Sequence, residues 1–288
     1  MLSTDRKGPL FMMAAAVCWS FGGLFIKFMP WSAMSIISVR AMFAALVYMI
    51  YRRSAKIDFT FSNVLTAICV SGTTILFVFA NKLTTAGAAV LLQFTAPVFI
   101  ILIRFVFFKK KPTISSCIAV ALTLMGMLLF FADRLEEGQL LGNLLAIASG
   151  LAFAGVFVCN NRPETNPDHA LLLGFLINSV VGLPFLFMEA SADPLAWGAG
   201  IAMGIAQVGL GYIFFSKGIK RTPALLACLI SAVEPVLNPI WVFLAGIWGW
   251  LPMIETPGRY ALIGGVIIVL TIVGYNIWVE KRPTKEEA

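Results

Sequence analysis

Long runs of apolar residues alternate with short polar stretches along the whole chain. A helix that crosses a bilayer needs about 20 mostly apolar residues, and ten of the runs are long enough. They cover approximately residues 8–28, 32–51, 62–81, 84–107, 114–131, 141–160, 169–188, 195–216, 222–246 and 260–279. The connections between them are short. The pattern therefore predicts an all-α membrane protein with ten transmembrane helices and no sizeable soluble domain.

Composition agrees with this fold class. Of 288 residues, 60% are hydrophobic and 12% are charged, and the mean hydropathy is +0.92. A soluble core of this length does not need so much apolar surface. The net charge of +7 does not indicate nucleic acid, because most Lys and Arg lie in short connections, where they orient a protein in the membrane. The expected partner is the lipid bilayer, and no nucleic acid is expected.

The distribution of Lys and Arg predicts the orientation. With the N-terminus inside, 16 of the 21 lie in inside segments and 4 in outside segments, while Arg40 lies within a span. Such a bias, together with an even number of helices, places both termini in the cytoplasm. The first apolar run follows Arg6 and Lys7 and is long enough to span, so it is read as a transmembrane helix rather than a cleavable signal.

The two halves of the chain resemble one another at an offset of 138 residues. The most distinctive identities at this offset are Lys82/Lys220, Thr84/Thr222 and Pro97/Pro235. Two repeats are therefore predicted, residues 1–135 with helices one to five and residues 136–288 with helices six to ten and a short cytoplasmic tail. Because each repeat has an odd number of helices, the second is expected to be inverted, as is typical of secondary transporters. The alternative is an old duplication retained in a scaffold or channel.

Several segments, taken in order, resemble a known family. They are AAVCWSFGGLFIK in the first predicted helix, ISVRAMFAAL in the second, AGAAVLLQFTAPVFIIL in the fourth, PALLACLISAVEPVLNPIW in the ninth and the glycine-rich ALIGGVIIVLTIVG in the tenth. Together they resemble the drug/metabolite transporter superfamily, and within it the EamA-type ten-helix permeases. The resemblance implies transport of a small metabolite across the inner (plasma) membrane. It does not identify the metabolite, because members carry amino acids, sugars, quaternary amines and drugs.

The ninth predicted helix carries the most unusual polar residues. Helical spacing places its Ser231, Glu234, Asn238 and Trp241 on one face. At the offset of 138, Gln93 in the fourth helix corresponds to Ser231. The prolines of both segments remove ladder hydrogen bonds and are expected to bend or break the helices. Polar residues beside such a break are where a repeat transporter binds its substrate.

Two charged residues lie inside predicted spans, and each has a functional and a structural interpretation. Glu234 could carry a coupling proton, or bind a cationic ammonium group, or be a structural carboxylate paired with Arg40. Arg40 could hold a substrate carboxylate through paired hydrogen bonds, or it could pair internally. A functional role and a structural role therefore remain open alternatives for each residue.

The remaining candidates are aromatic and amide side chains. Trp19 and Tyr212 could line a cavity or simply pack, and Asn178 and Gln207 could bind solute or join helices. His169, the only histidine, falls in a polar loop and is expected to be solvated. No motif for ATP, a metal or nucleophilic catalysis occurs, so neither an enzyme nor a cofactor is expected.

These observations favour a secondary transporter that moves a small organic metabolite by alternating access. Efflux of an amino acid or related solute is the specific hypothesis, with proton coupling through Glu234 as its extension. The alternatives are a transporter of quaternary ammonium or other organic cations and, from another class, a channel or facilitative pore. The sequence does not decide whether the protein is a monomer or a homodimer.

Overall fold

The computed structural model describes residues 7–26, 28–84, 86–132, 140–189, 193–250 and 258–281, and every regular element in these ranges is helical. Six spans are single helices: α3 (Ala33–Arg52), α4 (Phe61–Leu83), α7 (Ile114–Phe131), α8 (Leu140–Asn160), α9 (Pro167–Glu189) and α14 (Arg259–Lys281). Four are interrupted: α1 (Lys7–Ser20) with α2 (Gly22–Ile26), α5 (Ala86–Gln93) with α6 (Ala96–Phe108), α10 (Pro194–Ala202) with a π-helical segment η2 (Met203–Leu210) and α11 (Gly211–Ile219), and α12 (Ala224–Ser231) with α13 (Val233–Ile247). All ten are long and apolar enough to cross a membrane, which confirms the predicted number of transmembrane helices.

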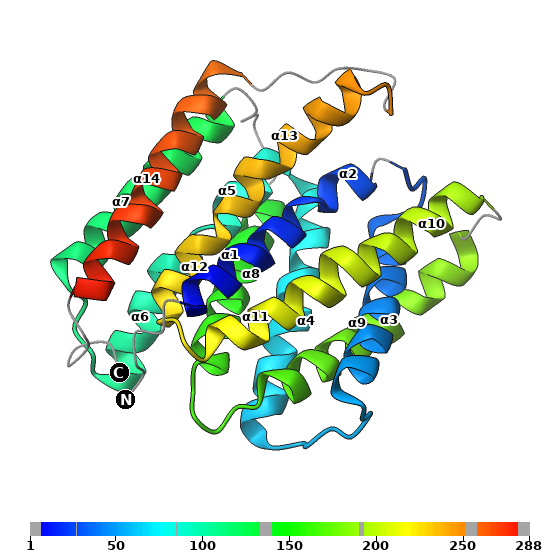
Figure 1. The fold of residues 1–288 in the computed structure, drawn as a ribbon, viewed down its shortest axis with the longest axis horizontal. Helices are drawn as coiled ribbons and strands as arrows, with labels where there is room; N and C mark the ends of the chain where they lie inside the picture. The colour runs from blue at the N-terminus through cyan, green and yellow to red at the C-terminus, as the bar shows by residue number, and fades with distance from the viewer. Residues whose placement is uncertain are drawn as a thin grey trace.

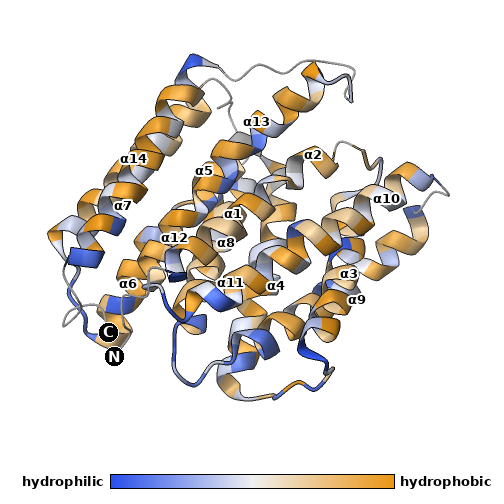
Figure 2. Cartoon of the chain, viewed as in Figure 1, coloured by the Kyte–Doolittle hydropathy of each residue, from blue (hydrophilic) through white to orange (hydrophobic). Residues whose placement is uncertain are grey.

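The outer surface of the helix bundle is apolar, as expected for a protein surrounded by lipid hydrocarbon chains. Large apolar side chains are exposed along the outer helices, for example Leu122 and Met125 on α7 and Leu262, Val266 and Val269 on α14. Their spacing of three or four residues gives each helix one apolar outward face. Figure 2 shows that hydrophilic residues gather mainly at helix ends and connections, while most of each helix is apolar.

The two breaks in the fourth and ninth spans occupy corresponding positions. α5 ends at Gln93 and α12 ends at Ser231, which are 138 residues apart. The breaks lie before the prolines rather than at them, because Pro97 and Pro235 fall in the first turns of α6 and α13, where a missing N–H costs no helical hydrogen bond. Pro239 lies inside α13 without ending it, so of the two expected effects, a bend or a break, the break does not occur at this residue.

The helix contacts are equivalent in the two halves of the chain. α3 packs against α9 and α7 against α14, so the second and fifth spans each meet their counterparts in the other half. α4 packs on α8, and α1 packs on α11, which is the same pairing with the halves exchanged. Figure 1 shows α7 and α14 side by side at one edge of the bundle. The predicted boundary between the repeats, 135/136, lies outside the described residues. The inversion of the repeats stays a prediction.

The eighth span approaches α3 very closely at Gly204. A β-carbon at this position would lie 2.5 Å from the β-carbon of Phe43 and 2.9 Å from the carbonyl oxygen of Arg40. Gly200, one turn earlier, meets a Val39 methyl group in the same way, at 2.8 Å. These two glycines therefore allow the eighth span to pack closely on α3, next to Arg40.

Replacing Gly204 by Ala is expected to destabilise the protein by about 1–3 kcal/mol, because the backbone of α3 must move to admit the methyl group. Thermal unfolding in detergent measures the effect. Gly198→Ala on the same span is the matched control, since a β-carbon there meets nothing within 4 Å. Equal unfolding temperatures for the two variants would contradict this account of the contact.

Candidate functional site: a central cavity between the helices

A cavity of about 160 Å³ lies inside the bundle. Seven of the ten residues singled out from the sequence line it: Trp19, Arg40, Gln93, Asn178, Gln207, Tyr212 and Glu234. They come from seven different elements, namely α1, α3, α5, α9, η2, α11 and α13. Asn178 lies near the middle of α9, and Gln207 lies near the middle of its span, so the cavity is at mid-depth. By the space that buried water needs, it has room for on the order of ten water molecules.

Two opposite charges face this cavity. Arg40 from α3 and Glu234 from α13 both line it, and each lies within the electrostatic influence of the other. Among the described residues, no ion pair within 4.0 Å involves either side chain. Both are partly accessible from the cavity rather than packed in protein. The cavity therefore offers one cationic and one anionic group that are not neutralised by direct contact.

Trp19 and Tyr212 form one aromatic wall. Their ring centroids are 4.9 Å apart, and the Trp19 ring also packs 5.7 Å from that of Phe215. Gly211 permits this packing, because a β-carbon there would lie 2.7 Å from the Trp19 indole nitrogen. The Gln207 amide donates a hydrogen bond of 3.1 Å to the Trp19 carbonyl and so joins η2 to α1.

Gln93 lies at the end of a hydrogen-bonded chain of side chains. Its amide donates to the hydroxyl of Ser149 on α8 at 2.8 Å, and that hydroxyl donates to the carbonyl of Thr73 on α4 at 2.9 Å. The chain fixes the broken end of α5 against two continuous helices. Gln93 is thus positioned by protein partners on one side while it lines the cavity on the other.

Three buried polar atoms at the cavity have no hydrogen-bond partner in the part of the chain that the structure describes. They are the indole nitrogen of Trp19 and the side-chain amide oxygens of Asn178 and Gln207. A buried polar atom that makes no hydrogen bond costs about 1–3 kcal/mol. All three atoms belong to residues of the cavity lining, so this lining holds two acceptors and one donor that the described protein leaves without a hydrogen bond.

The other three sequence candidates, all on the ninth span, are not among the residues that line the cavity. Ser231 is fully buried, and its hydroxyl donates to the Cys228 carbonyl at 2.6 Å. The Trp241 indole donates to the Ser20 hydroxyl at 2.8 Å and stacks on Phe21, while Asn238 is half-buried. The break between α12 and α13 separates Ser231 from the other three residues of the predicted face, which all lie on α13.

The lining also includes residues that the sequence analysis did not select. They are Thr73, Thr74 and Phe77 on α4, Phe153 on α8, Phe175 on α9, and the small or aliphatic Ala41, Val70 and Val208. The one usable signal was the polar run of Ser71, Thr73 and Thr74 within an apolar span. The phenylalanines of the lining gave no such signal, because the chain contains 24 phenylalanines and nothing in the sequence distinguishes these three.

A packed layer closes the cavity towards the end of the bundle where α1 begins and α14 ends. Its large side chains are fully buried and lie one to two turns from cavity residues on the same spans: Met12, Tyr48, Phe157, Leu171 and Phe215. The Tyr48 hydroxyl donates to the Tyr212 carbonyl at 2.5 Å, which ties α3 to α11 beneath the cavity. Buried core side chains therefore form the floor of the cavity on this side.

His169 corrects another expectation. It was expected in a solvated loop, but it lies in the first turn of α9 with its side chain only 13% exposed. Its Nε2 atom accepts a hydrogen bond of 2.7 Å from Arg52, and its Nδ1 lies 3.2 Å from the carboxylate of Asp58. The residue joins the connection after α3 to α9 and lies away from the cavity.

Ten membrane-spanning helices around a polar cavity at mid-depth define a multi-pass membrane protein of transporter type. The model of the EamA-like transporter family matches residues 6–132 and again 140–277. The chain belongs to the EamA-like transporter family. Its expected substrate is accordingly a small molecule, and the resemblance drawn from the sequence is confirmed.

Relatives of known sequence agree with this class. An uncharacterized transporter of Archaeoglobus fulgidus is 26% identical over 195 residues, covering 67% of this chain and 68% of that protein. The threonine/homoserine exporter RhtA of Escherichia coli K12 is 22% identical over 224 residues, covering 76% of this chain and 72% of that protein. A solved crystal structure superposes with a TM-score of 0.81 at 18% identity and covers 97% of this chain and 100% of the other. That likeness shows a shared fold.

Proposed function

We propose that the protein is a secondary transporter that exports a small zwitterionic metabolite, an amino acid or a close relative, by alternating access. The observation that carries this proposal is the presence of Arg40 and Glu234 on one cavity without a direct ion pair. A zwitterion brings a carboxylate for the guanidinium and an ammonium group for the carboxylate. Both charges are then neutralised by the substrate, which lowers their cost in the membrane interior.

Size and hydrogen-bonding capacity support the same class. A cavity of about 160 Å³ suits a solute of a few heavy atoms beyond the amino and carboxyl groups. The three unpartnered polar atoms from Trp19, Asn178 and Gln207 favour a polar side chain on that solute. The relative RhtA is named a threonine/homoserine exporter, and both of those amino acids carry a hydroxyl group.

Proton coupling is part of the proposal. A single carboxylate cannot hold a proton and an ammonium group together. Glu234 would release its proton when substrate binds and take one up after the substrate leaves. Because the proton and the substrate ammonium group compete for the same carboxylate, one proton is exchanged for each substrate molecule. The inward proton gradient would then drive export.

The proposed membrane is the inner (plasma) membrane, with both termini in the cytoplasm. The bias of Lys and Arg towards one set of connections supports this orientation. In this orientation the floor beneath the cavity lies on the cytoplasmic side, and the substrate site faces outwards. Two inverted repeats, exchanging their conformations, would then open the opposite side.

The test is counterflow into proteoliposomes with a panel of labelled and competing solutes. Neutral polar amino acids are expected to compete, whereas the matching primary amines without a carboxylate and the matching acids without an amino group are expected to compete at least tenfold less well. Saturation and trans-stimulation are expected, because a carrier must return to the starting side. Unsaturable flux without trans-stimulation would contradict a carrier and favour a facilitative pore.

A second candidate, transport of organic cations, is favoured by one observation. Aromatic rings from Trp19, Tyr212 and Phe175 surround a cavity that also holds Glu234, and a cation over a ring face gains about 0.5–2 kcal/mol. Arg40 on the same cavity opposes a lone cation. Quaternary amines that compete better than amino acids in the same panel would replace the first proposal with this one.

A further inference from the structure

A second, basic cavity lies at one end of the bundle, outside the central site. Two adjoining pockets, of about 220 Å³ and 30 Å³, share Arg104 and Lys110 in their linings. Arg162 lines the larger pocket and Lys111 the smaller one. We name the two pockets together the basic cleft, defined by Arg104, Lys110, Lys111 and Arg162. None of the described residues that line it is acidic.

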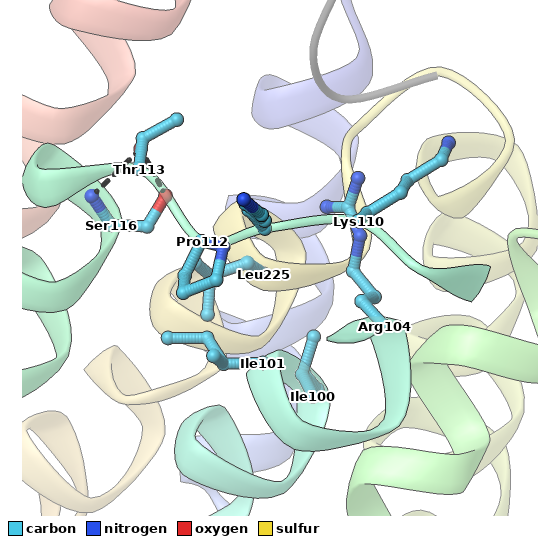
Figure 3. Close-up of a pocket in the computed structure, with 9 residues that line it drawn as sticks. Ile100, Ile101, Arg104, Lys110, Pro112, Thr113, Ser116 and Leu225 are labelled. Carbon is cyan, nitrogen blue, oxygen red and sulfur yellow. Dashed lines mark hydrogen bonds between the residues drawn. The ribbon is translucent and has the colours of Figure 1, made fainter. Parts of the chain in front are cut away.

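The end of α6 builds the cleft. α6 stops at Phe108, and Lys109 adopts the left-handed conformation with φ of 57°. The chain turns back, so that the backbone N–H of Lys110 donates to the carbonyl of Arg104 at 3.1 Å. Figure 3 shows the Arg104 side chain reaching from α6 up to the segment that carries Lys110, with the hydroxyls of Thr113 and Ser116 on the other side. The turn therefore brings the backbones of Arg104 and Lys110 together, so that both residues line the same cleft.

Positive charge is crowded in the cleft. Burial and, to a smaller extent, the neighbouring Arg104 lower the pKa of Lys110. On the far wall, the Arg162 guanidinium lies 6.0 Å from the Phe108 ring centroid, and its Nε is 3.5 Å from the carboxylate of Glu164. That carboxylate is 63% exposed and balances Arg162 only in part. An anion bound between the two walls would be attracted by Lys110 on one side and by Arg162 on the other.

The surroundings of the cleft indicate where such an anion comes from. The last turns of α6 expose Leu102, Phe105, Val106 and Phe107 on the outside of the bundle, and Phe107 is 76% exposed. This apolar face runs from the cleft towards the middle of the membrane. Inside the cleft, Ile101, Phe108 and Val158 provide apolar walls below the charges. A headgroup in the cleft would place its acyl chains along the exposed face of α6.

We propose that the basic cleft binds the phosphate headgroup of an anionic phospholipid from the adjacent leaflet. A cluster of Lys and Arg between helix ends at the membrane surface is a suitable site for an acidic headgroup, because each cation near the surface adds to the attraction. The lipid would bridge α6 and the connection between α8 and α9. It would thereby hold the broken fourth span against the other half of the protein.

The experiment measures lipid retention by native mass spectrometry and thermal stabilisation in a neutral detergent. The full-length protein is titrated with phosphatidylglycerol, with phosphatidylcholine and with soluble glycerol phosphate. Phosphatidylglycerol is expected to remain bound and to raise the unfolding temperature, whereas the other two ligands leave both unchanged. Lys110→Gln and Arg104→Gln are each expected to weaken phosphatidylglycerol binding about fivefold. Lys110→Gln alone suffices for the test if Arg104→Gln unfolds.

Lys109→Gln is the matched control, because Lys109 is adjacent and exposed but lines neither pocket. It is expected to bind phosphatidylglycerol like the unmodified protein. Equal weakening by Lys109→Gln would mean diffuse surface charge and would overturn the site. Equal stabilisation by phosphatidylcholine would overturn the requirement for negative charge, and equal stabilisation by glycerol phosphate would assign the cleft to a soluble anion instead. Each readout is binding, so the result is independent of any transport substrate.

Discussion

Substitution of Glu234 by Gln is expected to abolish proton-driven transport in proteoliposomes while the protein stays folded. Gln keeps the size of the side chain but can neither release a proton nor neutralise an ammonium group. Loss of a charged hydrogen bond costs about 1.5–3 kcal/mol, so affinity for the amino acid falls roughly 10- to 100-fold. The rate driven by a pH gradient falls further, because the exchange of a proton for substrate is lost. Flux of labelled substrate with and without the gradient measures both effects.

Glu164→Gln serves as the control for Glu234→Gln. Its carboxylate is 63% exposed and lies beside Arg162, away from the central cavity. Transport by this variant is expected to match that of the unmodified protein. Full transport by Glu234→Gln across a range of pH values would remove the coupling role and leave Glu234 as a structural carboxylate.

Replacing Arg40 by Gln is the second change with a large effect, because it removes the only positive charge among the residues that line the central cavity. Affinity for a zwitterionic substrate is expected to fall roughly 10- to 100-fold, by the same range of energies for a charged hydrogen bond. The matching amine without a carboxylate should bind no more weakly than before. Thermal shifts with both ligands separate loss of a substrate contact from general damage.

Arg40→Lys provides the comparison for this second prediction. Lys retains the charge but not the paired hydrogen bonds that a guanidinium makes to a carboxylate. An intermediate affinity is expected for Arg40→Lys. If Arg40→Gln weakened the zwitterion and the amine equally, Arg40 would be an internal partner of Glu234 rather than a substrate ligand.

The fold could be predicted largely from the sequence because the bilayer makes each span nearly independent. Length and hydropathy suffice to place ten helices, and predicted ends such as 32–51 and 114–131 lie close to α3 and α7. The interruptions could not be placed in this way. No local pattern marks the π-helical segment η2, which contains the Gly204 that packs closely on α3.

The sequence indicated the site residues that carry a charge, because charged residues are rare in membrane spans. It did not indicate those whose place in the cavity depends on the three-dimensional packing of the helices. Arg40 and Glu234 stand out because charge is expensive in a span, and both line the cavity. Asn238 and Trp241 were selected by helical spacing from Glu234 on the same helix, α13, but that spacing does not tell how far along the helix the cavity extends. Phe153 and Phe175 were missed because a phenylalanine facing a cavity and one facing lipid look the same in a sequence.

One consequence follows from the difference between the two broken spans. The position that holds Glu234 in the second half holds Ala96 in the first, and Ala96 is fully buried in the core. If the halves exchange conformations, the two access states are alike in backbone shape but not in charge. The apparent affinities for substrate at the two faces of the membrane are then unequal, and the carrier transports asymmetrically. Its preferred direction can be read from the ratio of half-saturation concentrations on the two sides.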